Sequence, residues 1–402
     1  MNIKREVTAK SAKYWPSDEI LIFTGARQAG KTTVLRQIQD ELKTQGQNQF
    51  FLTLEDPEYL ALLDEHPKNI FKIMPGGSRG RIVVFIDEIQ YLKNPTNFLK
   101  YLYDEHGGKI KLIVTGSSAF YLDKKFRDSL AGRKIIFPVN TLSFREFLLF
   151  KKEKDLYQKD FNVLGLAEKN KLSAYYYEYL LYGGYPRVVL SELNEKENIL
   201  RELAYSYIKK DIYEAGVRQD EIFYKLFKIL AVQVGCLVNS SELSNTLDIS
   251  KTAVDNYLLV MQKSFHIFLV KPFHQNIRKE ISKMPKIYFN DLGLRNFFTG
   301  DFRGLAARND QGQLLENAVF RQLRERYELE KIKFWRTTDQ KEIDFVVGDQ
   351  EALEVKHNVK NLKIKNWEYF LKIYPSFKLS IISLDAKIDK IESYPVVDAW
   401  KI

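Results

Sequence analysis

A short run of residues near the start of the chain matches a phosphate-binding pattern, G-x-x-x-x-G-K-[ST]. It reads Gly25-Ala26-Arg27-Gln28-Ala29-Gly30-Lys31-Thr32. Glycines in such a loop let backbone N–H groups surround a phosphate, and the N-terminus of the following helix adds a partial positive charge. We expect Lys31 to reach the β- and γ-phosphates of a nucleotide, and the hydroxyl of Thr32 to help hold Mg²⁺. Thr33, the next residue, completes the set expected at the cofactor.

The elements on either side of this loop are those that it needs in order to work. Residues 19–24 form an apolar run short enough for a buried strand, and residues 33–38 carry apolar side chains at helical spacing. A chance glycine turn with a surface lysine would not require this strand and this helix. We therefore interpret the loop as a nucleotide cradle.

Two further strands end in polar side chains that complement this loop: residues 81–86 lead into Asp87 and Glu88, and the next apolar strand ends at Thr115. In a parallel sheet the carboxyl ends of the strands share one edge, so these side chains are expected near the loop. Asp87 is expected to share the Mg²⁺ shell with Thr32. Glu88 is placed to polarise the attacking water, and Thr115 to sense the γ-phosphate and orient that water. Acids at strand ends often only cap a helix, but complementary chemistry at three strand tips predicts hydrolysis of a nucleoside triphosphate with Mg²⁺.

Arg133 is a further catalytic candidate, in the loop before the last apolar strand of this region, residues 135–139. Near a nucleotide it would act as an arginine finger or as a sensor. The alternative is a loop arginine that pairs with surface acids. Both interpretations stay open at this point.

Composition limits the classes of protein to which the chain can belong. Its 402 residues exceed one ordinary domain, and 45% of them are hydrophobic, enough for more than one core. A single cysteine, Cys236, excludes an internal disulfide framework, and the five histidines are too scattered for a zinc cluster. Residues 1–15 lack the apolar segment of a signal peptide, and no stretch approaches the roughly 18 apolar residues of a membrane span. We expect a cytoplasmic protein with no membrane partner, whose net charge of +10 permits binding to a polyanion.

The middle of the chain is expected to be helical and rich in aromatic residues. Tyrosines cluster between residues 175 and 185, next to Gly183 and Gly184. Aromatic residues at this density usually form a core between helices, and stacking on a nucleic-acid base is the alternative. We favour the core.

Residues 239–272 follow the order of a winged helix-turn-helix: a short capped helix, a turn, a second helix over 251–262 and an apolar strand. In a DNA reader the second helix enters the major groove. The side chains that would then face the groove are Lys251, Thr252 and Asn256. Only one lysine opens this helix and Asp255 stands beside it, which favours the other common use of the fold, as a packing module.

Two short strands near the C-terminus are joined by residues 348–351. Their alternation predicts that Ile343, Phe345 and Val347 of the first strand and Leu353 and Val355 of the second all face the core. Odd positions must then pair with odd ones, which places Phe345 opposite Val355 and Val347 opposite Leu353. Asp344, Glu354 and Lys356 are left together on the other face.

These polar residues define a second candidate site. Asp344 and Glu354 are expected to bind Mg²⁺, and together with Lys356 to activate water for phosphodiester cleavage. Glu316, on an upstream helix, can supply a further metal-binding acid. The alternative is an amphipathic hairpin with a solvated polar face.

As a whole the chain resembles a prokaryotic family of AAA-type ATPases with an uncharacterised C-terminal domain, found in archaea and bacteria. The segments that carry the likeness are 25–33, 84–90, 115–118, 130–133, 182–187, 288–294, 315–320 and 342–356. The resemblance implies ATP binding and hydrolysis. The C-terminal order Glu…Asp…Glu-x-Lys is similar to the nuclease fold of restriction endonucleases and archaeal Holliday-junction resolvases. One departure is Gln28, where many relatives carry a basic residue.

The expected fold class is α/β. The domains are a P-loop ATPase domain with a parallel sheet (1–143), a helical lid or linker (144–235), a winged-helix domain (236–300) and a nuclease-like α+β domain (301–402). Two functions fit this plan: an ATPase coupled to DNA binding or processing, or a regulatory ATPase switch whose C-terminal half is a protein-interaction module without nuclease activity. A transport motor is disfavoured, because no membrane segment is visible. The expected partners are ATP and, according to the function, DNA, another protein or further copies of the chain.

Overall fold

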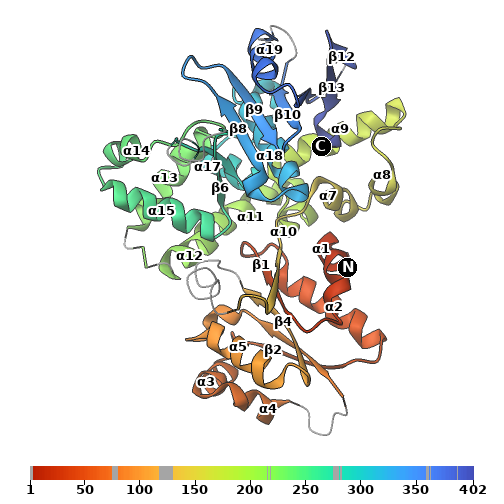
Figure 1. Cartoon of the computed structure of the whole chain (residues 1–402), viewed down its shortest axis with the longest axis vertical. Helices are drawn as coiled ribbons and strands as arrows, with labels where there is room; N and C mark the ends of the chain where they lie inside the picture. The colour runs from red at the N-terminus through yellow and green to blue at the C-terminus, as the bar shows by residue number, and fades with distance from the viewer. Residues whose placement is uncertain are drawn as a thin grey trace. The chain divides into compact units, whose positions relative to one another are not determined.

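A computed structural model describes residues 3–74, 80–116, 130–214, 216–217, 219–274, 280, 283–358, 362, 364–386 and 388–402. The chain divides into two compact units, which Figure 1 colours from red to orange and from yellow to blue. Unit 1 comprises residues 1–141 with 263–265, and unit 2 comprises residues 142–262 and 266–402. The first boundary that we expected, after residue 143, lies close to this division. The finer division of unit 2 into three domains stays a prediction.

Unit 1 is built on a parallel sheet of five strands in the order β2-β3-β4-β1-β5. The strands are β1 (Ile20–Thr24), β2 (Asn48–Thr53), β3 (Ile82–Asp87), β4 (Ile110–Gly116) and β5 (Lys134–Pro138). β5 lies at an edge, as expected for a strand with a proline, which cannot donate a ladder hydrogen bond. Because all strands run in one direction, their carboxyl ends lie at a single edge of the sheet.

Helices cover both faces of this sheet. They are α1 (Glu6–Ser11), α2 (Lys31–Thr44), α3 (Pro57–Glu65), α4 (Ile70–Ile73) and α5 (Pro95–His106), with the short turns η1 (Ala12–Tyr14), η2 (Pro67–Asn69) and η3 (Ile89–Tyr91). One face packs Ile22, Val84 and Val114 against apolar residues of α3, α4 and α5. The other face packs Phe23 and Phe85 against α2 and the N-terminal segment. The sheet is therefore buried on both sides, which explains its continuous apolar strands.

Unit 2 begins with helices. They are α7 (Phe144–Phe150), α8 (Lys154–Gln158), α9 (Leu166–Tyr182), α10 (Pro186–Leu190), α11 (Lys196–Glu202), α12 (Ile208–Glu214) and α13 (Asp220–Val232), with η4 (Leu193–Glu195) and the π-turn η5 (Leu203–Tyr207). The tyrosine cluster forms a core, as expected: Tyr176 and Tyr179 are buried, with ring centroids 4.8 Å from Phe144 and 5.5 Å from Phe147, respectively.

The helical part is joined to α17 (Leu292–Thr299) by two glycine-containing segments that interlock. Asp291, the N-cap of α17, accepts a hydrogen bond from the N–H of Gly184 at 2.8 Å. A Cβ on Gly293 would lie 2.1 Å from the carbonyl oxygen of Tyr182, so only glycine fits there. Asn296 donates to the carbonyls of Leu180 and Leu181, at 2.9 Å each. The end of α9 and the start of α17 are therefore packed backbone to backbone.

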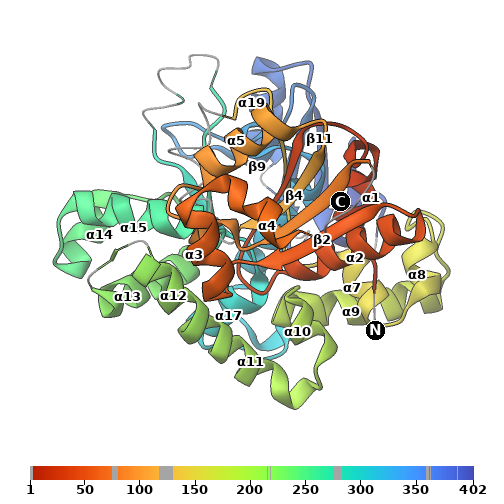
Figure 2. The same cartoon turned by 90° about the horizontal axis from the view of Figure 1, so that it is seen from below.

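Helices α14 (Ser240–Leu247) and α15 (Lys251–Lys263) follow α13, and a two-stranded antiparallel ladder of β6 (Ile267–Val270) and β7 (Lys286–Phe289) comes next. Figure 1 and Figure 2 both show α13, α14 and α15 next to one another. Leu237 adds an antiparallel bridge to Lys286 of β7. The expected helix, turn, helix and strand are thus present, and α15 buries Val254, Leu258 and Met261.

The C-terminal part of unit 2 contains a six-stranded sheet in the order β12-β13-β11-β10-β9-β8. Its strands are β8 (Ile332–Arg336), β9 (Glu342–Val347), β10 (Glu351–Lys356), β11 (Lys378–Ser383), β12 (Lys390–Ile391) and β13 (Tyr394–Asp398). The remaining helices and turns are η6 (Leu305–Ala307), α18 (Gln311–Arg326), η7 (Leu329–Lys331), α19 (Ile364–Ile373) and η8 (Ala399–Lys401). Trp367 and Phe370 of α19 pack on one face of the sheet, whereas Phe320 of α18 packs against Phe345.

The register that we predicted for β9 and β10 is wrong by two residues. Leu353 lies opposite Phe345, not Val347, and the ladder ends there. The cause is the connection: Gly348 adopts φ 56°, which allows a tight turn over residues 348–350 instead of the longer loop that we assumed.

The expected alternation of faces also fails within β9. Between the same two points of the ladder, β8 advances from Lys333 to Trp335 while β9 goes from Val346 to Ile343. One extra residue therefore lies in β9, which is a β-bulge. As a result Ile343 and Val346 both join the core under α19, while Phe345 turns toward α18.

Candidate functional site

The loop between β1 and α2 has the backbone that a phosphate cradle requires. Gly30, the N-cap of α2, adopts φ 97°, and Gln28 adopts φ 61°. A Cβ on Gly25 would lie 2.0 Å from the carbonyl oxygen of Val139, so this position admits only glycine. Gln28, Thr32 and Thr33 are exposed, whereas Ala26, Arg27 and Ala29 are buried beneath them. The loop thus presents its exposed side next to the N-terminus of a helix.

Lys31 is held inside this loop. Its Nζ donates hydrogen bonds to the carbonyl oxygens of Gly25 and Ala26, at 3.1 Å each, and the residue is buried. This places the ammonium group within the turn that the cradle forms, as its expected role at the β- and γ-phosphates requires.

Asp87, at the carboxyl end of β3, is hydrogen-bonded to the start of α2 and to the end of β4. Thr32 Oγ1 donates to Asp87 Oδ2 at 2.8 Å, and Thr115 Oγ1, on β4, donates to Asp87 Oδ1. Thr115 Oγ1 in turn accepts the backbone N–H of Glu88 at 2.9 Å. A hydroxyl and a carboxylate oxygen that lie this close are the hard oxygen ligands that Mg²⁺ takes, so the residues present fit the ion.

Glu88 follows Asp87 in a left-handed conformation, with φ 58° and ψ 51°. Such a backbone is uncommon for a residue other than glycine and is typical of functional sites. The carboxylate of Glu88 accepts a hydrogen bond from the side-chain amide of Gln90, which is buried. The sequence analysis did not single out Gln90, although its position two residues after the expected base was visible.

Arg5 is a second residue that the sequence analysis missed. Its Nη1 donates to the carbonyl of Ala29, within the loop, at 2.7 Å, and its Nη2 donates to the carbonyl of Asn140 at 2.9 Å. Its backbone N–H bonds Gln37 of α2 at 3.1 Å. Arg5 therefore ties the phosphate loop to the segment after β5. No local pattern marks it, because its partners lie far along the chain.

Arg133 lies away from the loop. It precedes β5, and its carbonyl accepts the N–H of Ile20, the first residue of β1. The phosphate loop follows the other end of β1, and a strand of 5 residues at about 3.3 Å per residue separates the two by roughly 15 Å. The guanidinium pairs with Asp104 at 2.7 Å. A sensor role within the same chain does not fit this geometry, whereas a role across subunits stays a prediction. Ser117 and Ser118 lie outside the described residues.

The C-terminal acids gather around a lysine that the sequence analysis did not consider. Lys286 of β7 is buried, and its Nζ lies 3.0 Å from Glu316, 2.6 Å from Glu342 and 3.9 Å from Asp344. Burial alone would lower the pKa of Lys286, but these acids hold that pKa above its ordinary value. Glu316 also accepts from the hydroxyl of Tyr288 at 2.6 Å. Lys286 therefore remains charged at the centre of the group.

The expected cluster of Asp344, Glu354 and Lys356 is present, although through a different register. Asp344 Oδ2 accepts the N–H of Val355 at 2.8 Å, in place of a ladder partner, and Lys356 Nζ lies 3.7 Å from this oxygen. Lys356 also pairs with Glu354 at 2.6 Å. Burial, and then the charge of Asp344, raise the pKa of Glu354 against the attraction of Lys356.

Mg²⁺ does not fit this C-terminal cluster as it stands. The ammonium groups of Lys286 and Lys356 lie among the carboxylates, where a divalent ion would have to enter. Among the described residues no group of three or more histidine, cysteine, aspartate or glutamate side chains is arranged to hold a metal ion. We therefore derive no metal-dependent step from Glu316, Asp344 and Glu354.

Comparisons with known proteins match three parts of the chain to family models. Residues 17–148 match a family model described as AAA domain, residues 173–303 one described as Domain of unknown function (DUF8612), and residues 311–401 one described as Domain of unknown function (DUF4143). An uncharacterized protein of Haemophilus influenzae is 30% identical over 405 residues, which cover 95% of this chain and 94% of the relative. The chain belongs to the family of that protein. An uncharacterized protein of Methanocaldococcus jannaschii is also similar to this chain. The two are 28% identical over 414 residues, which cover 96% of this chain and 88% of the relative.

This chain therefore carries an N-terminal P-loop AAA ATPase domain, in agreement with the expected fold class. Solved structures with a likeness include Orc1 of Aeropyrum pernix in complex with DNA, with 14% identity, TM-score 0.31 and coverage of 73% of this chain and 91% of that one. AMPPCP-bound DnaA from Aquifex aeolicus has 14% identity, TM-score 0.29 and coverage of 64% and 86%. No helix among the described residues is long and apolar enough to cross a membrane.

Proposed function

We propose that this family member binds ATP with Mg²⁺ and hydrolyses it at the carboxyl edge of the unit 1 sheet. The observation that carries the proposal is the hydrogen-bonded set around Asp87, which joins Thr32 of the phosphate loop to Thr115 of the neighbouring strand. Phosphoryl transfer needs little more than positioning and charge stabilisation, and these strand tips provide both.

Each residue of this site has a role that its geometry supports. Lys31 and the backbone of residues 25–30 bind the phosphates, and Thr32 and Asp87 would hold Mg²⁺, which neutralises charge on the phosphate oxygens. Thr115 fixes the orientation of Asp87 and of the Glu88 backbone. Glu88 is the general base that orients and deprotonates the attacking water.

Two variants test this assignment. Glu88→Gln keeps the shape of the side chain and spares Asp87, so it should bind ATP with unchanged affinity and lose turnover by about 10²-fold or more. Lys31→Ala should lose ATP binding itself, because it removes the charge that faces the phosphates. Fluorescent-nucleotide binding and phosphate release measure the two effects separately. Turnover by Glu88→Gln at the wild-type rate would show that Glu88 is not the base.

Coupling to DNA is a second candidate function, favoured by one observation. On α15 the residues Lys251, Thr252 and Asn256 are exposed, beside a β6–β7 ladder, in the order of a winged helix. Duplex DNA should then stimulate ATP turnover, less so at 0.3 M salt than at 0.05 M, and Lys251→Glu should weaken this stimulation. Absence of stimulation by single-stranded, duplex and branched DNA would favour the other candidate, a regulatory ATPase switch that acts on a protein.

The C-terminal domain bears on the second candidate function, coupling to DNA, because a nuclease-like fold was expected there. The residue order Glu…Asp…Glu-x-Lys motivated the expectation of a nuclease-like fold, but Lys286 and Lys356 already pair with the acids. We infer that this cluster stabilises the domain and does not cut phosphodiesters. Mg²⁺-dependent cleavage of any DNA form by the wild-type chain, abolished by Asp344→Ala, would contradict this inference.

A further inference from the structure

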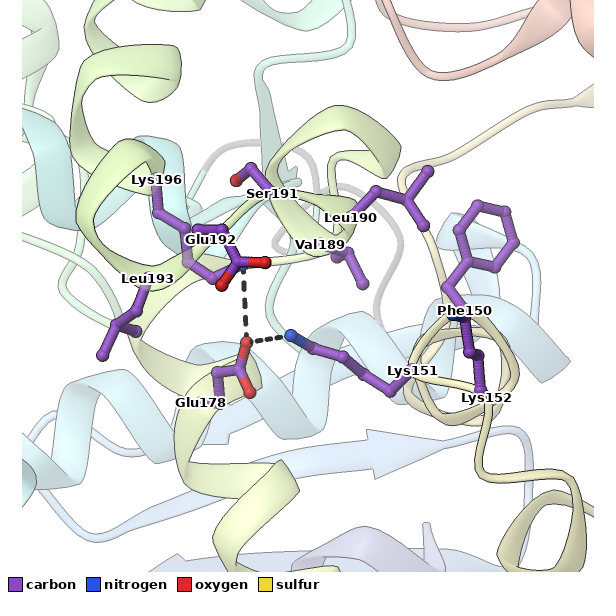
Figure 3. Close-up of a pocket in the computed structure, with 10 residues that line it drawn as sticks. All are labelled: Phe150, Lys151, Lys152, Glu178, Val189, Leu190, Ser191, Glu192, Leu193 and Lys196. Carbon is purple, nitrogen blue, oxygen red and sulfur yellow. Dashed lines mark ion pairs between the residues drawn. The ribbon is translucent and has the colours of Figure 1, made fainter. Parts of the chain in front are cut away.

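A pocket of about 470 Å³ lies in the helical part of unit 2, and none of the residues assigned a role above lines it. Figure 3 shows its lining, which comes from four helices and the segments between them. Lys151 and Lys152 follow α7, Glu178 lies on α9, and Lys196 lies on α11. The volume is within the range of about 300–1,000 Å³ that is typical of ligand sites.

The polar side of the pocket has more positive than negative groups. Glu178 Oε1 pairs with Lys151 Nζ at 2.6 Å and lies 3.5 Å from Lys196 Nζ, so one carboxylate oxygen serves two ammonium groups. Lys196 is buried, with 1% of the residue exposed, and its Nζ also donates to the carbonyl of Val188. Lys152 and the exposed Glu192 complete the charged lining. Three lysines thus face two glutamates, which favours an anionic ligand group.

The apolar side of the pocket continues onto the surface. Phe150 and Val189 are buried in its wall, whereas Leu190 and Leu193 are 56% and 62% exposed. These two leucines bracket Ser191 and Glu192 in the segment from α10 to η4. Large apolar side chains that are exposed at the rim of a hollow are a feature of interaction sites. A small acid confined to the hollow would leave both leucines in water, whereas a peptide that crosses the mouth would cover them.

We propose that this pocket binds a segment of a protein partner in which large apolar side chains stand next to acidic ones. The apolar side chains pack on Leu190, Leu193 and Phe150, and the carboxylates pair with Lys151 and Lys152. If the chain is a regulatory switch, such a protein is the partner on which it acts. Binding of the segment itself does not require ATP hydrolysis.

The test uses a phage-displayed library of random dodecapeptides, selected on the full chain and counter-selected on a Leu190→Ser/Leu193→Ser double variant. Both leucines are largely exposed, so these substitutions leave the fold intact, which circular dichroism checks. Peptides that remain should combine aromatic or leucine residues with aspartate or glutamate. The proposal would be overturned if the recovered peptides were basic. It would also be overturned if no recovered peptide bound the wild-type chain better than the double variant.

One enriched peptide is then synthesised and its affinity is measured by fluorescence anisotropy. Leu193→Ser should weaken binding about tenfold, from the lost burial of one leucine. Lys152→Glu should weaken it and Glu192→Lys should strengthen it, each about threefold, with both effects reduced in 0.5 M salt. The matched control, Leu166→Ser, changes a leucine that is 77% exposed and does not line the pocket, and it should have no effect.

Two other occupants, a small fatty acid and a second copy of the chain, are tested alongside the peptide. Octanoate that binds while no peptide does would show a small-molecule site and overturn the proposal. Light scattering tests whether wild-type chains associate with one another. If they do, if Leu193→Ser abolishes this association and if no peptide binds, the pocket is a contact between copies and the proposal is overturned. Since binding is measured without nucleotide, failure here leaves the ATPase assignment untouched, and the Glu88→Gln test leaves the pocket untouched.

Discussion

Asp87 shows how much one residue of the proposed ATP site depends on its neighbours. Both carboxylate oxygens are occupied by threonine hydroxyls from other elements, so the orientation of the carboxylate is fixed before any ligand arrives. The sequence predicted this set because a parallel sheet forces strand ends to one edge, whatever the side-chain details. The same reasoning could not predict Gln90, whose contact with Glu88 depends on a left-handed backbone that no pattern marks.

Gln90 provides a prediction at this scale. Replacement by leucine, which has a similar size but no amide, removes the hydrogen bond to the Glu88 carboxylate. We expect kcat to fall about tenfold with the affinity for ATP unchanged, since a positioned general base contributes about 10²–10⁴-fold and only its positioning is lost. Steady-state phosphate release at varied ATP concentrations separates kcat from KM. A higher kcat in Gln90→Leu would mean that Gln90 restrains Glu88.

Arg133 provides a second prediction. In its own chain the side chain pairs with Asp104, far from the loop. If Arg133 completes the site of a second copy, Arg133→Ala and Lys31→Ala proteins should each be inactive, and their mixture should regain part of the turnover at composite interfaces. Light scattering confirms that the variants still assemble. A mixture that stays inactive although assembled would leave Arg133 with the Asp104 contact alone, and Asp104→Ala serves as the control for loss of that contact.

At the scale of elements, glycines and one bulge decide what alternation could not. The period of two in β9 and β10 predicted correctly that odd-numbered residues pair with odd-numbered ones. It did not predict the register, because Gly348 allows a tighter turn than we assumed. The extra residue in β9 then changes which side chains face α19. A hydrophobic pattern does not reveal such an insertion, since Ile343, Phe345 and Val346 are apolar on either face.

The packing of α17 on the end of α9 gives a prediction for an element contact. Gly293→Ala would place a Cβ 2.1 Å from the Tyr182 carbonyl oxygen, so the two segments must move apart. Overpacking of this kind costs about 1–3 kcal/mol, and the loss of the Asn296 and Asp291 hydrogen bonds would add to it. Amide hydrogen exchange in residues 176–190 and 291–299 should accelerate accordingly. The control Gly304→Ala adds a Cβ with nothing within 4 Å of it. It should change the free energy of opening that hydrogen exchange measures by less than about 0.5 kcal/mol.

At the scale of the whole chain, acids that the sequence predicted to bind a metal instead form ion pairs that connect parts of unit 2. The sequence placed Asp344, Glu354 and Lys356 together, but it could not place Lys286, which lies on another strand and reaches Glu316, Glu342 and Asp344. Long-range ion pairs have no local signature. Their effect is nevertheless large, because a buried charge left without its partner is costly.

Lys286 therefore gives the last prediction. Lys286→Met keeps a long side chain but leaves three carboxylates facing one another, which should destabilise the C-terminal sheet by about 3–5 kcal/mol. Hydrogen exchange in β9 and β10 reports this local stability, and the affinity for ATP should be unchanged because the cluster lies wholly in unit 2. The control Lys341→Met removes an exposed pair with Asp339 and should leave exchange in β9 and β10 nearly unchanged. In a Lys31→Ala background, Mg²⁺ should not slow exchange in β9 and β10 of the otherwise wild-type chain. If it does, the acids bind the ion in spite of Lys286, and the cluster is a metal site after all.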